Sequence, residues 1–332
     1  MAKKQRILSG NRPTGKLHWG NYFGALKNWV ELQDEYECFF FVADWHSLTS
    51  EYDNVKGINE SVHEILIDWL AAGLDPKKST IFIQSLVPEH AELHVLLSMI
   101  TPLGWLERVP TYKDMKNELK NKDLNMYGFF GYPVLQTADI IIYNAHKVPV
   151  GEDQVAHIEL SREIVRRFHN LTQTEIFNEP KPLLTPAPRV PGVDGRKMSK
   201  SFDNAIYLSD DEATVEKKLM RTITDPQRKR RNDPGDPDVC NIWYYHKLYT
   251  DKSKQDEIHK GCTSGTFGCV DCKKLCAVNA NEYWKEFRIK RAKLAKDPKK
   301  VLGVALDGSK KAQKDVQALM DKVRRAMGVK YS

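Results

Sequence analysis

Two segments that lie far apart in the sequence carry residue types suited to holding a polyphosphate. Residues 13–21 read PTGKLHWGN, and residues 195–201 read GRKMSKS. The first segment places His18 and Asn21 at the expected start of a helix, where backbone N–H groups and the positive helix end favour an anion. The second supplies Lys197 and Lys200 with two hydroxyls on a short loop. Two separate clamps on one nucleotide suggest adenylate chemistry in which pyrophosphate leaves.

A third segment, GEDQ at residues 151–154, follows a predicted strand and begins a predicted helix. An acidic residue there could simply favour the positive end of the helix. Alternatively, Glu152 or Asp153 holds the ribose hydroxyls of a nucleotide, as acidic residues do in related nucleotide-binding folds.

These segments also carry a family resemblance. Residues 13–21 resemble the HIGH motif, and residues 195–201 match the KMSKS motif, of class I aminoacyl-tRNA synthetases. With SGNRPTG at 9–15 and VPVGEDQ at 148–154, the chain resembles bacterial tryptophanyl-tRNA synthetases over nearly its whole length, least around 225–280. The resemblance implies a homodimer that activates L-tryptophan with ATP and Mg²⁺, forming Trp-AMP and pyrophosphate. It then implies transfer of tryptophan to tRNA(Trp).

The resemblance also implies which residues bind ATP. They are Arg12, Pro13, Thr14, His18, Gly20, Asn21, Gly151, Glu152, Asp153, Val190, Lys197, Met198, Ser199, Lys200 and Ser201. Lys113 matches a third phosphate-contacting lysine of the family. Catalysis is then expected from Lys197, Lys200, Lys113 and Asn21, which neutralise charge on the leaving pyrophosphate and position it.

Asp139 is the residue expected to read the amino acid. It lies in an otherwise apolar segment, PVLQTADIII at residues 133–142, and a buried carboxylate is costly unless it meets a donor or a charge. The indole N–H of tryptophan is such a donor, whereas the structural alternative is an exposed Asp on an amphipathic helix. The resemblance adds further residues to the tryptophan pocket: Gln136, Tyr132, His46, Gln154 and Gly10.

Two other functions remain open from the sequence. Gln136 stands where well-known family members have Met, which keeps tyrosyl-tRNA synthetase as an alternative. Against it, the first strand ends Leu8-Ser9-Gly10, where a tyrosine site would favour Tyr. The second alternative is a non-catalytic paralogue that binds tRNA or senses tryptophan, and the intact Lys197, Lys200 and Asp139 argue against it.

Five of the six cysteines fall close together, with the spacing C-x21-C-x6-C-x2-C-x3-C. Such a run argues for a metal, and both zinc and an iron–sulfur cluster accept four thiolates. A subset of tryptophanyl-tRNA synthetases carries a [4Fe–4S] cluster on C-x22-C-x6-C-x2-C. By that resemblance Cys240, Cys262, Cys269 and Cys272 are the ligands and Cys276 is a spare, with Zn²⁺ as the alternative metal.

The elements that must position these residues follow from hydrophobic patterning. Short apolar runs alternate with helical patterns, which predicts an α/β, Rossmann-like, doubly wound parallel sheet with a helical C-terminal domain. Strands are expected at 6–9, 38–43, 79–84 and 148–150, and helices at 18–36, 57–72, 92–100, 132–143, 152–168, 210–220, 281–296 and 309–327. Five prolines between 171 and 196 exclude long regular structure there, so this stretch is interpreted as a linker. Residues 1–190 are then the catalytic nucleotide-binding domain. Residues 191–332 carry the KMSKS loop and a tRNA anticodon-binding domain with the cysteine insertion.

Charge and hydropathy limit the class of partner. The net charge of +7 suggests a polyanionic partner, although a mildly basic solvated surface explains it equally well. Basic runs at 227–231 and 288–291 would suit tRNA phosphates. No apolar stretch is long enough for a signal sequence or a membrane span, so a cytoplasmic protein without a membrane partner is expected.

Overall fold

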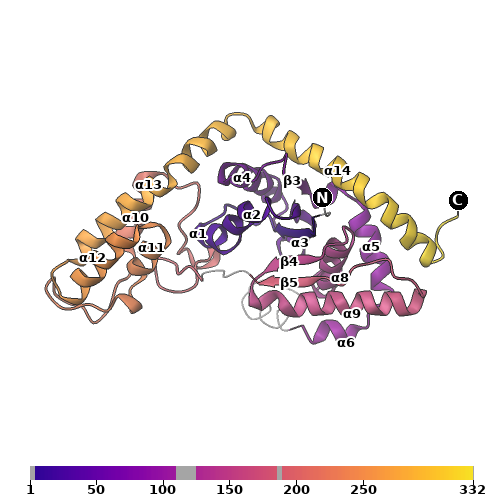
Figure 1. The fold of residues 1–332 in the computed structure, drawn as a ribbon, viewed down its shortest axis with the longest axis horizontal. Coiled ribbons are helices and arrows are strands. Elements are labelled where there is room, and N and C mark those ends of the chain that lie inside the picture. The colour runs from indigo at the N-terminus through magenta and orange to yellow at the C-terminus, as the bar shows by residue number, and fades with distance from the viewer. Residues whose placement is uncertain (1–3, 110–124, 185–188, 332) are drawn as a thin grey trace. The chain divides into compact units, whose positions relative to one another are not determined.

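The computed structural model describes residues 4–109, 125–184 and 189–331, and it contains one five-stranded sheet. The strands are β1 (Arg6–Asn11), β2 (Glu37–Val42), β3 (Ser79–Ile83), β4 (Lys147–Val150) and β5 (Lys181–Leu184). Figure 1 shows β4 and β5 side by side. Every pairing is parallel, and the order is β3-β2-β1-β4-β5. The chain therefore reverses its direction of travel beside β1, which confirms the predicted doubly wound sheet.

The chain forms two compact units. The first contains Met1–Gly15, Asn28–Pro186 and Asp297–Ser332, and the second contains Lys16–Lys27 and Ala187–Lys296. The sheet belongs to the first unit. Its helices are α3 (Asp44–Glu51), α4 (Lys56–Ala72), α5 (Glu89–Ser98), α6 (Leu103–Glu107), α8 (Tyr127–Ile141), α9 (Val155–Thr172) and α14 (Pro298–Ala326), together with nearly all of α2 (Lys27–Leu32). Single 3-10 turns follow β3 at Gln84–Leu86 and β4 at Glu152–Gln154.

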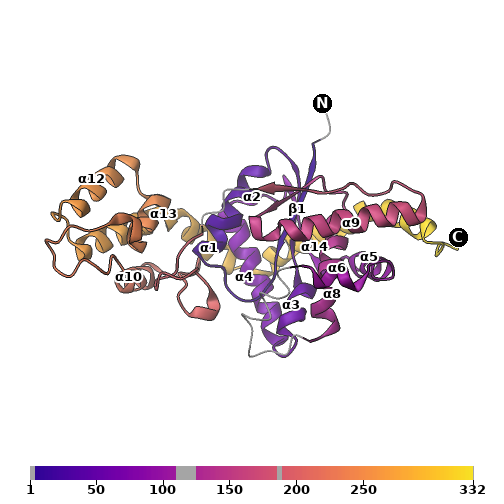
Figure 2. The ribbon, with the colours of Figure 1, turned by 90° about the horizontal axis from the view of Figure 1, so that it is seen from below.

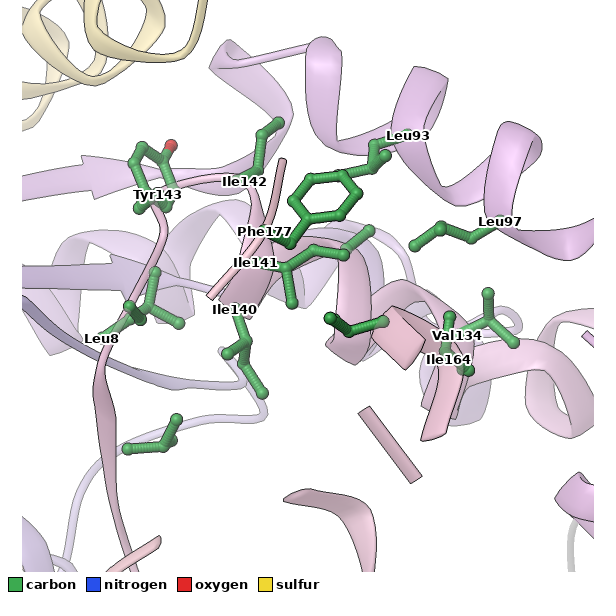
Figure 3. Packing of buried hydrophobic residues seen from close by; sticks show 14 of the residues in the cluster. Leu8, Leu93, Leu97, Val134, Ile140, Ile141, Ile142, Tyr143, Ile164 and Phe177 are labelled. Carbon is green, nitrogen blue, oxygen red and sulfur yellow. The ribbon is translucent and has the colours of Figure 1, made fainter. Parts of the chain in front are cut away.

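Strand β2 is buried along almost its whole length because apolar side chains cover both faces of the sheet. On one face Phe40 stacks on Trp29 of α2 with 5.0 Å between ring centroids. On the other face Phe39 and Phe41 join a core to which α5, α8, α9 and α14 all contribute. Figure 3 shows part of this core, where Leu93, Ile141 and Phe177 point toward one another.

Strand β5 was not predicted, since it lies in the proline-rich stretch interpreted as a linker. Pro182 pairs with Val148 of β4 even though a proline has no N–H to donate. The position is allowed because β5 is the last strand of the sheet, so one side of it needs no ladder partner.

Helix α14 covers the opposite edge of the sheet. The N–H of Ile83 in β3 donates to Ser309 Oγ at 3.1 Å, and a Cβ on Gly308 would overlap the carbonyl oxygen of Ile81. The absence of a side chain at Gly308 therefore lets helix backbone lie directly against strand backbone. Figure 1 shows α14 beside β3, and the helix belongs to the unit that contains the sheet.

The second unit is mainly helical and is held together by aromatic side chains. It contains α1 (Trp19–Asn21), a π-helical turn (Tyr22–Leu26), α10 (Glu212–Arg221), α11 (Asn241–Tyr249), α12 (Lys252–Thr263) and α13 (Cys269–Ala295) (Figure 2). Trp19 stacks on Trp284 of α13 at 5.9 Å between ring centroids and meets Tyr245 and Tyr249 of α11 edge-on. The helix predicted at 18–36 is thus a short helix, a π turn and α2, ending at Leu32. Across the residues that the structure describes, no helix has the combination of length and apolar character needed to cross a bilayer.

Candidate active site

The two predicted phosphate-binding segments meet within the second unit. The N–H of Trp19 donates to the carbonyl of Ile206 at 2.9 Å, and the N–H of Leu208 donates to the carbonyl of Leu17 at 2.9 Å. His18 forms an antiparallel bridge with Tyr207 between these two bonds. The first motif is therefore hydrogen-bonded to the chain that leaves the KMSKS loop.

His18 lies where the lysines of the loop affect its charge. Burial lowers the pKa of His18 to about 4, and the charges of Lys200 and Lys197 add to the effect. Its Nδ1 atom is buried and has no hydrogen-bond partner among the described residues. The neutral imidazole, beside two lysines, therefore keeps one polar ring atom unused by the fold.

Gly20 and Asn21 complete the first motif. A Cβ on Gly20 would lie 2.9 Å from the His18 ring and 3.7 Å from Met198 Cβ, so the glycine keeps the motif and the loop in close contact. Asn21 Oδ1 accepts a hydrogen bond from the backbone N–H of His18 at 3.0 Å, which fixes the start of α1.

Asn204, three residues after the KMSKS segment, organises the loop. It is 1% exposed, and its Oδ1 accepts from the N–H of Ser199 at 2.8 Å. Its Nδ2 donates to Asp194 Oδ1 at 2.7 Å and to the carbonyl of Lys197 at 3.2 Å. One buried side chain thus fixes the loop on both sides of Met198.

The segment that precedes the loop is held by α11. The N–H of Met198 donates to the carbonyl of Val190 at 3.1 Å. Tyr245 Oη donates to the carbonyl of Pro191 at 2.8 Å, and Asn241 Nδ2 donates to that of Gly192 at 3.1 Å. Val190 itself is buried, and its carbonyl is the group that pairs with the loop.

Asp139 of α8, in the first unit, is the centre of a buried polar cluster. Its Oδ2 lies 2.7 Å from Nε2 of His46, which α3 places just after β2. Its Oδ1 lies 2.8 Å from Nε2 of Gln84, just after β3, and 2.7 Å from Nδ1 of His90 in α5. His90 Nε2 in turn lies 2.9 Å from Tyr143 Oη. The predicted pair of Asp139 and His46 is therefore brought together.

The pKa of Asp139 reflects these partners. Burial alone would raise it, but the charges and hydrogen bonds of His46 and His90 outweigh burial and hold the pKa below its ordinary value. The side chain is 1% exposed and is nevertheless a carboxylate, because each oxygen accepts a hydrogen bond.

The other residues predicted for the amino-acid pocket lie at varying distance from this cluster. Tyr132 has its ring centroid 6.5 Å from that of His46, and its Oη lies 3.4 Å from His157 Nε2. Gln136 is half-buried in α8, and within the described part of the chain the side chains that bond Asp139 are His46, Gln84 and His90. Gly10 pairs with Phe41, and a Cβ on Gly10 would lie 2.7 Å from the carbonyl oxygen of Phe41.

The predicted ribose and phosphate residues of the first unit lie on exposed turns. Glu152 and Asp153 are exposed in the 3-10 turn after Gly151, and Gln154 Nε2 donates to Asp153 Oδ2 at 3.0 Å. After β1 the chain turns at Pro13, with the N–H of Thr14 donating to the carbonyl of Arg12 at 2.9 Å. Arg12 Nη1 lies 3.4 Å from Ser50 Oγ. Lys113 lies outside the described residues.

The cysteines gather at one end of the second unit. Cys240 precedes α11, Cys262 is in α12, and Cys269 and Cys272 are in the first turn of α13. Burial raises the pKa of the Cys240, Cys262 and Cys272 thiols, and neighbouring thiols raise each of them further.

Basic and aromatic side chains surround these thiols. Arg228 Nη1 lies 3.7 Å from Cys262 Sγ. Tyr249 Oη lies 3.0 Å from Cys276 Sγ, and burial raises the pKa of the Cys276 thiol to about 12. Within the described ranges no three or more His, Cys, Asp or Glu side chains already converge on a point that a metal ion could take.

Sequence reasoning missed Gln84, His90 and Tyr143 around Asp139 in the first unit, and Asn204 beside the KMSKS loop in the second. Gln84 ends the strand-like run STIFIQ, and a polar residue at the carboxyl end of a buried strand was the available signal. His90 lies before the predicted start of its helix, whereas the helix begins at Glu89. Tyr143 looked like one more apolar residue of the helix expected at 132–143, whereas α8 ends at Ile141, and Asn204 carried no sequence signal beyond its nearness to the loop.

Comparison with known proteins identifies the group to which the chain belongs. The family of class I tRNA synthetases for tryptophan and tyrosine (W and Y) matches residues 1–285. A tryptophan–tRNA ligase of Thermotoga maritima is 51% identical, covering 98% of this chain and 100% of that protein, and one of Aquifex aeolicus is 44% identical over 98% and 100%. The crystal structure of tryptophanyl-tRNA synthetase from Campylobacter jejuni, complexed with ADP and tryptophan, has a TM-score of 0.88 at 36% identity, covering 98% and 100% of the two chains. With its two phosphate-binding segments in contact on this fold, the chain is a member of the class I aminoacyl-tRNA synthetases of the tryptophan and tyrosine group.

Proposed function

We propose that this chain is a tryptophan–tRNA ligase, which activates L-tryptophan with ATP and then transfers it to tRNA(Trp). The observation that carries the proposal is the contact between the first motif and the KMSKS loop, in which a neutral His18 lies beside Lys197 and Lys200. The full-length similarity to tryptophan–tRNA ligases supports the same substrate.

The first half-reaction needs no protein nucleophile. The tryptophan carboxylate attacks the α-phosphorus of ATP, a P–O bond forms, and the bond to the β-phosphate oxygen breaks, releasing pyrophosphate. Lys197 and Lys200, with Lys113, neutralise the charge that develops on the leaving group. Asn21, Gly20 and His18 of the first motif hold the other side of the phosphates, and Mg²⁺ accompanies ATP without a protein cage.

The remaining ATP contacts come from turns at the ends of strands. Arg12, Pro13 and Thr14 follow β1, and Gly151, Glu152 and Asp153 follow β4, so acidic side chains are available for the ribose hydroxyls. The backbone of Val190 holds adenine. Met198, Ser199 and Ser201 complete the wall of the loop.

In the second half-reaction a ribose hydroxyl at the 3′ end of tRNA attacks the carbonyl carbon of Trp-AMP. An ester bond forms to the ribose oxygen, and AMP leaves with the electrons of the broken C–O bond. Lys229 and Arg230 are exposed near the cysteines and suit contacts to tRNA phosphates, which would make binding sensitive to salt. We place the enzyme in the cytoplasm, where its tRNA substrate is found.

We propose that Cys240, Cys262, Cys269 and Cys272 hold a [4Fe–4S] cluster. Their spacing and the guanidinium of Arg228 beside Cys262 suit a group that carries thiolate charge. When bound, such a cluster would tie α11, α12 and α13 together. Iron, acid-labile sulfide and zinc assays on protein purified without oxygen test this. Four zinc-binding thiols with no iron would assign Zn²⁺ instead, and no metal at all would refute the site.

We propose a homodimer that forms through α5, α6 and α8. Exposed apolar side chains gather on these mutually packed helices: Val95 at 49%, Met99 at 73%, Leu103 at 66% and Tyr127 at 74%. A patch of this kind on a soluble protein marks an interaction surface. Analytical ultracentrifugation of the wild type and of Met99→Asp tests the proposal, since the charge should yield monomers, and a wild-type monomer would refute it.

The experiment that tests the function is ATP–pyrophosphate exchange with each of the twenty amino acids, followed by charging of tRNA(Trp). Exchange with tryptophan alone is the expected result. Exchange with tyrosine would move the protein to the other branch of its family, and no exchange by folded protein would favour a non-catalytic tRNA-binding or tryptophan-sensing role.

A further inference from the structure

We propose that His90, held by Tyr143, is the positioning residue that leaves Asp139 a single acceptor site for the indole N–H of the substrate. This inference rests on the proposed function and specifies how its amino-acid site discriminates. Neither His90 nor Tyr143 lies in the motif segments at residues 9–21, 148–154 and 195–201.

Most of the acceptor positions on the Asp139 carboxylate are occupied by its neighbours. An ionised carboxylate offers about four lone-pair positions, two on each oxygen. Gln84 Nε2 and His90 Nδ1 occupy both positions on Oδ1, at 2.8 Å and 2.7 Å. His46 Nε2 occupies one position on Oδ2 at 2.7 Å. One position on Oδ2 is therefore left for a further donor.

Tyr143 holds the His90 ring so that its Nδ1 faces Asp139. Burial, and then the charge of Asp139, raise the pKa of Tyr143 well above its ordinary value, so its phenol keeps its proton. The ionised carboxylate of Asp139 can only accept, so His90 Nδ1, 2.7 Å from Oδ1, must be the nitrogen that donates to it, and His90 Nε2 is held 2.9 Å from the Tyr143 hydroxyl. The ring of Tyr143 is itself fixed, because it stacks on Phe39 at 4.7 Å and meets Phe82 at 5.3 Å.

The fixed hydrogen bonds of Asp139 bear on which amino acid the site accepts. His90 and Gln84 are both 0% exposed, so the carboxylate cannot exchange either bond for one to water. The plane of Asp139 is consequently fixed, with its one open position at a defined place. A substrate without an N–H leaves that position unpaired in a buried site, and such sites reject the incomplete analogue strongly. If His90 is removed, Oδ1 loses a donor and the carboxylate can rotate, so rejection weakens.

The probe is the tryptophan analogue in which sulfur replaces the indole N–H, 3-benzothienylalanine. The measured quantity is the ratio of kcat/KM for tryptophan to that for the analogue in ATP–pyrophosphate exchange. His90→Leu should lower this ratio by about tenfold or more and raise KM for tryptophan with KM for ATP unchanged. His90→Asn, whose amide reproduces the Nδ1 donor, should keep the ratio within about threefold of wild type.

Two further variants keep the test decisive. Tyr143→Phe preserves the ring contacts and removes only the hydroxyl, so it should lower the ratio in the same direction even if His90→Leu does not fold. His169→Leu removes a half-buried histidine whose Nε2 accepts a hydrogen bond from the N–H of Phe177. It should reduce stability without changing the ratio. A wild-type ratio in both His90→Leu and Tyr143→Phe would overturn this inference while leaving tryptophan activation intact. A wild type that fails to exchange with tryptophan would overturn the proposed function itself.

Discussion

Asn204→Ala tests whether one buried amide holds the KMSKS loop in its working shape. The substitution removes the hydrogen bonds to Ser199 N–H, Asp194 and the Lys197 carbonyl. Each of the two neutral bonds contributes about 1 kcal/mol and the bond to the Asp194 carboxylate about 2 kcal/mol, so the ordered loop loses about 4 kcal/mol in all. Since about 1.4 kcal/mol is a factor of ten in rate, kcat/KM for ATP should fall on the order of 1000-fold if the loop must be re-ordered in the transition state.

The assay is tryptophan-dependent ATP–pyrophosphate exchange with ATP varied at saturating tryptophan. Asn178→Ala is the matched control, because Asn178 Nδ2 also donates to a backbone carbonyl, that of Asn144, but both residues belong to the first unit and the KMSKS loop belongs to the second. The control should lose stability and keep its KM for ATP. Folded Asn204→Ala protein with kcat/KM for ATP within about twofold of wild type would refute the reasoning.

Three further outcomes are expected. Lys200→Ala should lower pyrophosphate exchange by about 100-fold or more while tryptophan binding, measured by calorimetry, stays unchanged; retained exchange would contradict its electrostatic role. Gly192→Ala should cost about 1–3 kcal/mol in urea unfolding, because its Cβ would overlap the Asn204 side chain, and an unchanged midpoint would contradict the close approach. Burial lowers the pKa of His157 to about 4, from 6.5, so the unfolded chain binds the proton first and stability falls as pH drops through that window. Between pH 7 and pH 5 the free energy of unfolding of the wild type should fall by about 2 kcal/mol more than that of His157→Gln. Parallel pH curves for the two proteins would contradict the lowered pKa of His157.

The parts of the fold predicted from sequence are those in which local pattern and tertiary role agree. Strand β2 is an apolar run along nearly its whole length, and β1 and β3 contain the shorter runs Ile7-Leu8 and Ile81-Phe82-Ile83; strands buried on both faces have that appearance. Strand β5 could not be recognised, since Pro182 reads as a strand breaker and is tolerated only because the strand lies at an edge. Docking of α14 on β3 depends on Gly308 and Ser309, two small residues whose meaning appears only once the strand lies beside them.

The candidate site divides in the same way. The segments 13–21 and 195–201 could be recognised because phosphate binding requires particular residue types in a fixed local order. His90, Gln84 and Tyr143 come from three different elements and meet only around Asp139. A lone buried histidine or glutamine carries no such order in the sequence. Residues that touch a ligand are thus easier to predict than those that hold the touching residue in place.

The helix that covers β3 has a consequence for how the protein is made. Ser309 is 226 residues beyond the Ile83 N–H that it satisfies, so a ribosome adding about 5–20 residues per second leaves this strand edge open for on the order of ten to fifty seconds. During that interval β3 presents unpaired backbone groups to any other extended chain. Nascent chains that stall before α14 emerges should therefore be the ones that aggregate and that chaperones retain.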